Sequence, residues 1–109
     1  TQEVTEYKAT NNIMAAFEKL DQDKTEEALV LINKAIEQSA NSAVAYTLKA
    51  EVLNNQKKHV EAISAQTKAI ELEKGNIYSS LIPNFYNTRG FLYLEIDDID
   101  NAIKDFETG

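Results

Sequence analysis

Few residues in this chain have types and spacings that could carry chemistry. His59 is the only histidine, and there is no cysteine. A histidine-based catalytic triad would have to use His59, and a metal site could draw on one imidazole only. His59 directly follows Lys57 and Lys58 at an expected helix start, a setting typical of surface residues. The lack of cysteine excludes disulfides, thiolate zinc sites and cysteine nucleophiles.

Two acidic stretches resemble cation sites. "DQDKTEEALVLI" from Asp21 begins like an EF-hand calcium loop, which needs glycine at its sixth place and glutamate at its twelfth. Glu26 and Ile32 stand there instead, and "DDID" from Asp97 lacks both residues too. Adjacent carboxylates such as Asp97 and Asp98 are common at helix starts, where they cap the helix. We therefore interpret both stretches as turns and caps.

Glycine-rich phosphate loops are also missing, because Gly75 and Gly90 stand alone. We therefore expect no enzyme activity, no catalytic residue, no cofactor and no metal ion. Catalysis would need chemistry supplied by another domain.

Composition narrows the range of partners. Hydrophobic residues make up 43% of the 109 residues, and the formal net charge is −7. An acidic surface repels phosphate backbones, so we expect no nucleic-acid partner. No apolar run approaches the roughly 18–20 residues of a membrane span, and no signal peptide is present, so we expect no membrane insertion. The chain begins at Thr1, as in a mature exported protein or a segment of a longer one, so its location is left open.

Small residues recur in three equal sets, which predict the elements that position everything else. "EALVLINKAIEQ" and "EAISAQTKAIEL" are near-copies 34 residues apart, and "NAIKDFETG" follows 40 residues later. Gaps of 12 and then 7 separate the small residues of each set, which are Ala16, Ala28 and Ala35; Ala50, Ala62 and Ala69; and Gly90, Ala102 and Gly109. Residues seven apart share a helix face, while each 12-residue gap crosses a polar, turn-like break. Each set therefore predicts one helix–turn–helix unit.

Six helices are expected, spanning roughly residues 3–20, 25–39, 43–55, 59–73, 79–95 and 98–108. Apolar residues at helical spacing, such as Ile99, Ala102, Ile103 and Phe106, support a buried stripe. The end signals are Asp23 with Glu26 as a capping box, Asn41 or Ser42, Gly75, Pro83 in a first turn, and Asp97 or Asp98.

Gly90 is expected inside a helix, where glycine costs about 1 kcal/mol relative to alanine. We interpret it as a point of close contact between the two helices of its unit, with Tyr86, Tyr93 and Phe106 packed around it.

These residues resemble the tetratricopeptide repeat, a 34-residue helix–turn–helix with an aromatic residue, a small residue and a tyrosine in its first helix. The last unit is most similar, with Tyr86, Gly90, Tyr93, Ala102 and Phe106. The resemblance implies an all-α, right-handed α-solenoid of three units in a single domain over residues 1–109. The expected units are 9–42, 43–76 and a truncated 83–109, with 77–82 as extra residues that lengthen the fifth helix. Whether the "DQDK" turn also holds two or three extra residues is left open.

The resemblance implies a protein-interaction module or scaffold that binds a peptide or partner protein in a concave groove. The first helices of the units line this groove. The matching positions are Ile13, Phe17, Thr47, Glu51, Asn54, Asn84, Asn87, Phe91 and Leu94. Asparagine can donate and accept hydrogen bonds to a peptide backbone, and Phe91 could hold an apolar side chain. Alternatively, Phe17 and Phe91 pack against neighbouring helices.

The expected ligand is neutral to mildly basic. One subclass of the family grips acidic chaperone tails with basic and asparagine side chains. The matching positions hold no basic residue; they are Ile13, Phe17, Leu48, Asn84 and Thr88.

The alternative function is a structural, self-associating solenoid segment of a longer multi-repeat protein. Solenoids need polar terminal repeats for solubility. Ile99, Ile103 and Phe106 would leave an apolar face uncovered, which could be buried in a homodimer.

Overall fold

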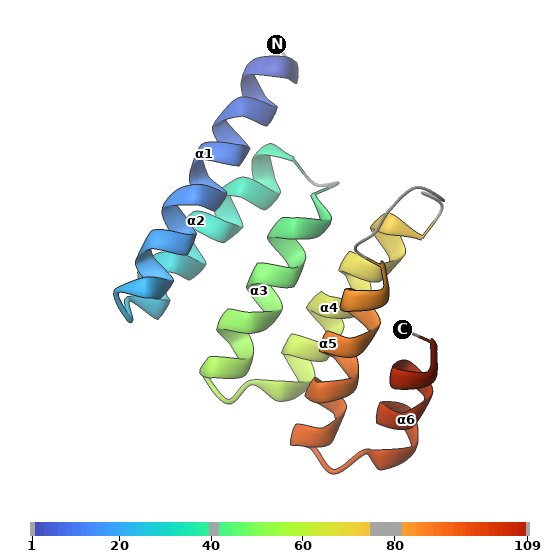
Figure 1. Cartoon of the computed structure of the whole chain (residues 1–109). Coiled ribbons are helices and arrows are strands. Elements are labelled where there is room, and N and C mark those ends of the chain that lie inside the picture. The colour runs from blue at the N-terminus through green and yellow to red at the C-terminus, as the bar shows by residue number, and fades with distance from the viewer. Residues whose placement is uncertain (1, 40–41, 75–81, 109) are drawn as a thin grey trace.

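The computed structural model describes residues 2–39, 42–74 and 82–108, and these residues form six α-helices (Figure 1). The helices are α1 (Gln2–Asp21), α2 (Thr25–Gln38), α3 (Ala43–Asn55), α4 (His59–Glu73), α5 (Ile82–Glu95) and α6 (Ile99–Thr108). The all-α fold class is confirmed, and the expected bounds of α3 and α4 match. Gly75, Gly109 and the extra residues 77–81 lie outside the described residues, while α5 begins at Ile82 with Pro83 in its first turn.

Each helix packs mainly against the helices before and after it in the chain. Figure 1 shows α1, α3 and α5 following one another across the molecule, with α2 and α4 behind them. The molecule is a flattened stack, 43 × 34 × 18 Å along its principal axes. A bundle wrapped around one central core would pair helices distant in the chain, so this arrangement is a solenoid of helical hairpins.

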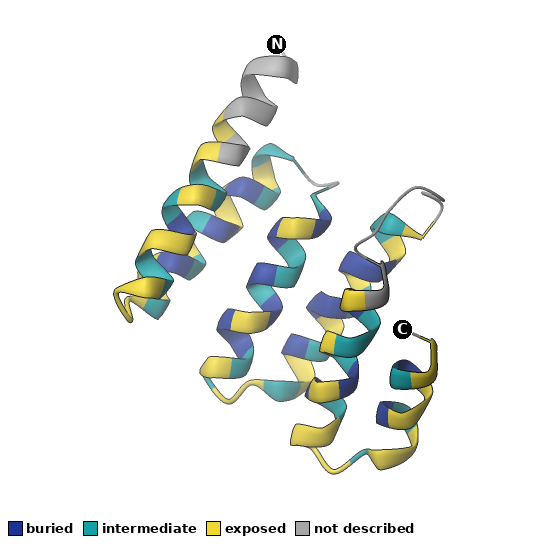
Figure 2. Cartoon of the chain, viewed as in Figure 1, coloured by how far each residue is buried: buried dark blue, intermediate teal, exposed yellow. Residues whose placement is uncertain are grey.

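Buried positions are found on each of the six helices (Figure 2), and the small residues of the three sets are among them. All seven alanines of the three sets are completely buried: Ala16, Ala28, Ala35, Ala50, Ala62, Ala69 and Ala102. Gly90 is buried as well, and a β-carbon built on it would lie 2.7 Å from the ring of Phe106. Gly90 is therefore glycine because the Phe106 ring occupies the space of a side chain.

The three hairpins share one turn, which corrects one expectation and answers one question that the sequence left open. Asp23, Lys57 and Asp97 all have positive φ, at 59°, 65° and 59°. The amide after each donates to the carbonyl five residues earlier, with N···O distances of 2.8, 2.9 and 2.9 Å, which is the Schellman pattern of a helix C-terminus. The first turn is thus as long as the others and holds no extra residues. Because Asp23 is the left-handed residue of the turn after α1 and not the residue before α2, it does not form a capping box with Glu26, and Lys24 precedes α2 without a side-chain cap.

Side-chain caps are present on two later helices. Ser42 Oγ accepts a hydrogen bond from the Ala45 amide at 3.2 Å before α3. Asp98 Oδ1 accepts from the Asn101 amide at 3.3 Å, and its Oδ2 accepts from the Asn101 side chain at 2.8 Å. Both expected caps are confirmed, and the choices between Asn41 and Ser42 and between Asp97 and Asp98 are resolved.

Candidate functional site

A hollow of about 310 Å³ lies between α3 and α5. Its lining comes from two stripes, one on each helix: Thr47, Glu51 and Asn54 on α3, and Thr88, Phe91 and Leu92 on α5. The α3 residues are spaced i, i+4 and i+7, so they project from one side of that helix. The packing of α3 beside α5 brings four sequence-predicted groove residues together with two others, Thr88 and Leu92.

Phe91 is the main apolar surface of this hollow, with 62% of its area exposed. Its ring meets the Phe106 ring of α6 edge-on, with centroids 5.1 Å apart and an interplanar angle of 67°. The packing alternative therefore holds in part for Phe91: the ring is steadied by a neighbouring helix and still faces solvent. A ring fixed in this way loses little entropy when a ligand covers it.

The side chain of Thr47 is hydrogen-bonded to Gln66, a residue that was not predicted from the sequence as part of the site. The Thr47 hydroxyl donates to Gln66 Oε1 at 2.6 Å, and Gln66 Nε2 donates to the Phe85 carbonyl at 3.3 Å. Gln66 is completely buried. The signal in the sequence was a polar residue, Gln66, at the position that Phe106 occupies in the last unit.

Asn54 is positioned by the only histidine. Asn54 Oδ1 lies 2.7 Å from Nδ1 of His59, so it accepts a hydrogen bond when that nitrogen carries the proton. This contact spans the turn between α3 and α4 and leaves the amide nitrogen of Asn54 without a role in it. His59 thus has a structural contact, and no group of three or more metal-ligating side chains occurs among the described residues.

The other predicted groove residues do not line this hollow. Ile13 is half-buried and packs against the core that contains Leu48 and Val52. Phe17 is 48% exposed and Leu94 38% exposed; Asn84 is exposed and Asn87 half-buried.

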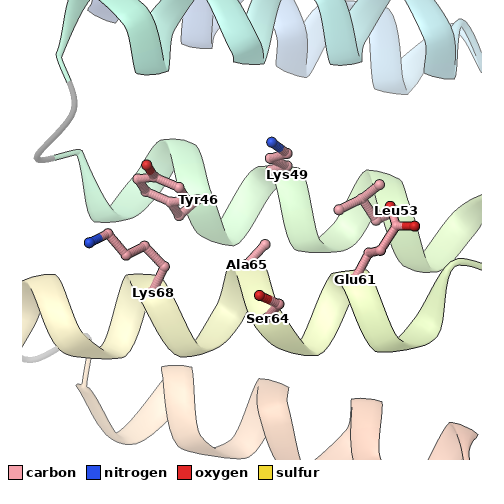
Figure 3. Close-up of a pocket in the computed structure, with 7 residues that line it drawn as sticks. All are labelled: Tyr46, Lys49, Leu53, Glu61, Ser64, Ala65 and Lys68. Atoms are coloured by element: carbon pink, nitrogen blue, oxygen red, sulfur yellow. The ribbon is translucent and has the colours of Figure 1, made fainter.

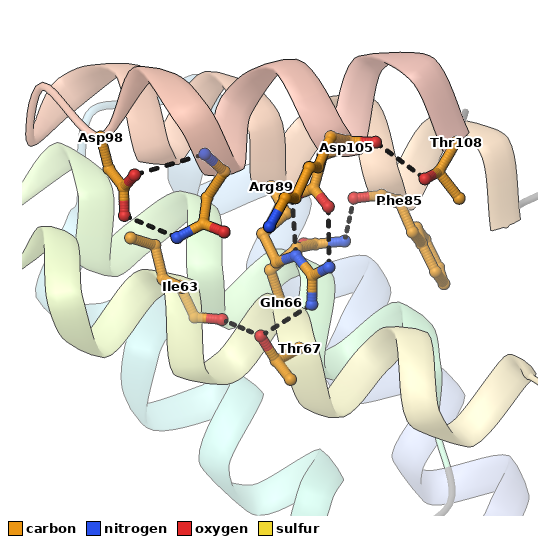
Figure 4. Close-up of polar contacts among 10 residues, drawn as sticks. Ile63, Gln66, Thr67, Phe85, Arg89, Asp98, Asp105 and Thr108 are labelled. Atoms are coloured by element: carbon orange, nitrogen blue, oxygen red, sulfur yellow. Dashed lines mark hydrogen bonds and ion pairs between the residues drawn. The ribbon is translucent and has the colours of Figure 1, made fainter.

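α5 is locked to α6 on another of its sides by an ion pair (Figure 4). Arg89 Nε and Nη2 donate to the two carboxylate oxygens of Asp105, each at 2.8 Å. Arg89 Nη1 donates to Thr67 Oγ1 at 3.3 Å, and the guanidinium lies 5.5 Å and 5.8 Å from the ring centres of Tyr86 and Tyr93. The hydrogen bonds to Asp105 raise the pKa of the Arg89 guanidinium against the opposing effect of burial. This cluster links α5 to Asp105 of α6 and to Thr67 of α4.

The comparisons with known proteins agree with this architecture. The family model described as "Tetratricopeptide repeat" matches residues 43–76 and 83–109, more than half of the chain. This chain is a tetratricopeptide repeat (TPR) protein. The comparison with curated proteins found no match.

Solved TPR structures share its fold. The N-terminal domain of stress-induced protein-1 (STI-1) from C. elegans superposes with a TM-score of 0.86 at 24% identity, over 95% of this chain and 83% of that one. The TPR domain of Arabidopsis FLU gives 0.87 at 20% identity, over 95% and 92%. The first TPR of Spaghetti (RPAP3), solved with the HSP90 peptide SRMEEVD, gives 0.83 at 22% identity, over 94% and 76%.

Of the residues that the resemblance matches to acidic-tail positions, none is basic. Leu48 is 2% exposed, and Ile13 packs into the core. Among the described helices, none is long and apolar enough to cross a membrane.

Proposed function

We propose that this TPR domain binds a partner protein by accepting a short peptide segment in the hollow between α3 and α5. The observation that carries the proposal is the pairing of a solvent-facing, ring-braced Phe91 with the polar stripe of α3 across the hollow. Extended and helical segments are both bound by surfaces that combine an apolar anchor with groups for the backbone.

The chemistry of the lining favours a neutral to mildly basic ligand. Phe91 and Leu92 would cover one apolar side chain, and Asn54 and Thr88 would bond peptide groups. Glu51 is exposed and places a negative charge in the hollow, within a chain whose net charge is −7. A ligand carboxylate would be repelled there, whereas a lysine or arginine would be attracted.

The bound HSP90 peptide in the Spaghetti TPR structure supports peptide recognition by this fold. An acidic tail of that kind does not suit this chain, because Leu48 is buried and the matching positions hold no basic residue. We therefore infer the same class of ligand, a peptide, with a different charge.

The test is a binding screen of the full chain against peptides that differ only in net charge around a central leucine. We expect the neutral and singly basic peptides to bind, and Phe91→Ala to weaken binding by roughly tenfold or more. Phe17→Ala is the matched control, since Phe17 is an exposed phenylalanine outside the hollow. Acidic peptides whose binding depends on Phe91 as strongly as that of the neutral peptides, or equal losses in both variants, would contradict the assignment.

Self-association is the second candidate, favoured by exposed isoleucines in α6 and in the turn before it. Ile96, Ile99 and Ile103 are 40%, 50% and 48% exposed, and α6 packs mainly against α5 among the described helices. A second copy would bury this surface in a symmetric dimer. Sedimentation at increasing concentration should show a dimer that Ile103→Lys abolishes; a monomer at all concentrations would exclude it.

A further inference from the structure

A second hollow, of about 430 Å³, lies between α3 and α4 (Figure 3). Lys49 and Tyr46 contribute from α3, and Ser64, Ala65 and Lys68 from α4. On α3, Lys49 lies two residues from Thr47 and two from Glu51. At about 100° per residue, it therefore projects about 200° around the helix axis from each of them. This hollow therefore opens on another side of α3 from the proposed peptide groove.

In the last unit, the place that matches this hollow is occupied by the side chain of Asp105. The middle and last units align with an offset of 40 residues, because Ala50 then matches Gly90, Ala62 matches Ala102, and the turn residue Lys57 matches Asp97. With the same offset, Lys49 matches Arg89, Tyr46 matches Tyr86 and Ala65 matches Asp105. In the last unit the cation is thus held by an internal carboxylate, with both N···O distances at 2.8 Å.

The middle unit keeps the cation and the aromatic ring but lacks the carboxylate, because residue 65 is alanine. Among the described residues, the ion pairs within 4.0 Å are Lys19–Glu27 and Arg89–Asp105, so neither Lys49 nor Lys68 is paired there. Glu61 also borders the hollow, one helical turn before Ala65, without such a contact. Two lysines, a tyrosine and a serine therefore line this hollow, and the matching place in the last unit holds the Asp105 carboxylate.

We propose that this hollow binds a carboxylate side chain, Asp or Glu, of a partner polypeptide, which takes the place that Asp105 has in the last unit. Charge complementarity carries the choice of ligand: Lys49 and Lys68 both line this hollow on an otherwise acidic chain, and charge-assisted hydrogen bonds are the strong ones. The site is separate from the peptide groove and selects the opposite ligand charge.

The first test uses a short blocked peptide with a central glutamate, and its glutamine twin, titrated into the ¹⁵N-labelled full chain. We expect saturable amide shifts around Lys49, Ala65 and Lys68 with the glutamate peptide only, weakening with added salt. Lys49→Gln should weaken binding by roughly tenfold. Lys58→Gln makes the same charge change at an exposed position that does not line the hollow, and it should leave affinity unchanged.

The second test installs the internal carboxylate. Ala65→Asp should abolish binding of the glutamate peptide although both lysines remain, because Lys49 then has the partner that Arg89 has. Asn55→Asp adds the same charge at an exposed position that does not line the hollow, and it should keep binding. Circular dichroism checks that each variant is folded; if Ala65→Asp does not fold, Lys49→Gln decides alone. Equal binding of the two peptides, shifts centred on Thr47 and Phe91, or no effect of Lys49→Gln would overturn the proposal.

Discussion

The Thr47 hydroxyl donates a hydrogen bond of 2.6 Å to Oε1 of Gln66, a side chain with no solvent exposure. Gln66 also donates to the Phe85 carbonyl, so one amide joins α3, α4 and α5 behind the hollow. A buried amide is stable only when its groups are paired. The contact therefore couples core packing to the position of a groove residue.

Gln66→Leu should lower the free energy of unfolding by about 1–3 kcal/mol, because the Thr47 hydroxyl loses its buried acceptor. The measurement is urea denaturation followed by circular dichroism. Adding Thr47→Val to Gln66→Leu should recover part of the loss, since both partners are then apolar. A double variant with fully additive losses would show that the hydrogen bond does not couple the two residues.

Gly90→Ala should destabilise the protein although alanine is the better helix former. A β-carbon there would lie 2.7 Å from Phe106 Cε1, and overpacking costs about 1–3 kcal/mol against a propensity gain of about 1 kcal/mol. Thermal unfolding should show a lower Tm. Phe106→Leu should reduce the effect of Gly90→Ala, and an unchanged effect would contradict the contact.

Lys57→Gly should stabilise the protein by about 0.5–1 kcal/mol. Lys57 has φ of 65°, a left-handed conformation that costs a residue with a β-carbon about 1–2 kcal/mol, offset in part by the greater chain entropy of glycine. The control is Glu71→Gly, exposed within α4, which should destabilise by about 1 kcal/mol. Chemical denaturation measures both, and losses of similar size would refute the turn argument.

Arg89→Met should lower the free energy of unfolding more than Asp105→Ala. The Asp105 side chain is 5% exposed and that of Arg89 18% exposed. Removing Arg89 strands a buried carboxylate, at about 3–5 kcal/mol, whereas an unpaired Arg89 can extend its charge toward water. Denaturation should therefore rank Arg89→Met as the more damaging, and the double variant should be more stable than Arg89→Met alone. If Asp105→Ala were the more damaging variant, the unpaired Arg89 guanidinium would cost more stability than the unpaired Asp105 carboxylate, which would contradict this argument.

The intervals between small residues predicted the helical hairpins, because closely packed helices require small side chains at fixed intervals. The same reasoning placed the bounds of α3 and α4, where a polar turn separates two apolar stripes. This reasoning failed at Asp23. Its side-chain type fits a capping box, but its backbone conformation is set by the three-residue turn that all three hairpins share. Side-chain type alone does not report φ.

By itself, the sequence determined the repeat and the helix faces, because these follow from the period of one helix, while the choice of Thr47, Glu51 and Asn54 came from the resemblance to the tetratricopeptide repeat. Only the tertiary structure decided that Phe91 and Thr88 face them across a hollow, that Gln66 reaches Thr47, and that Arg89 meets Asp105. Those contacts join residues on different helices. Their geometry depends on how far and at what rotation the helices pack, which is decided by the fit of all the buried side chains together.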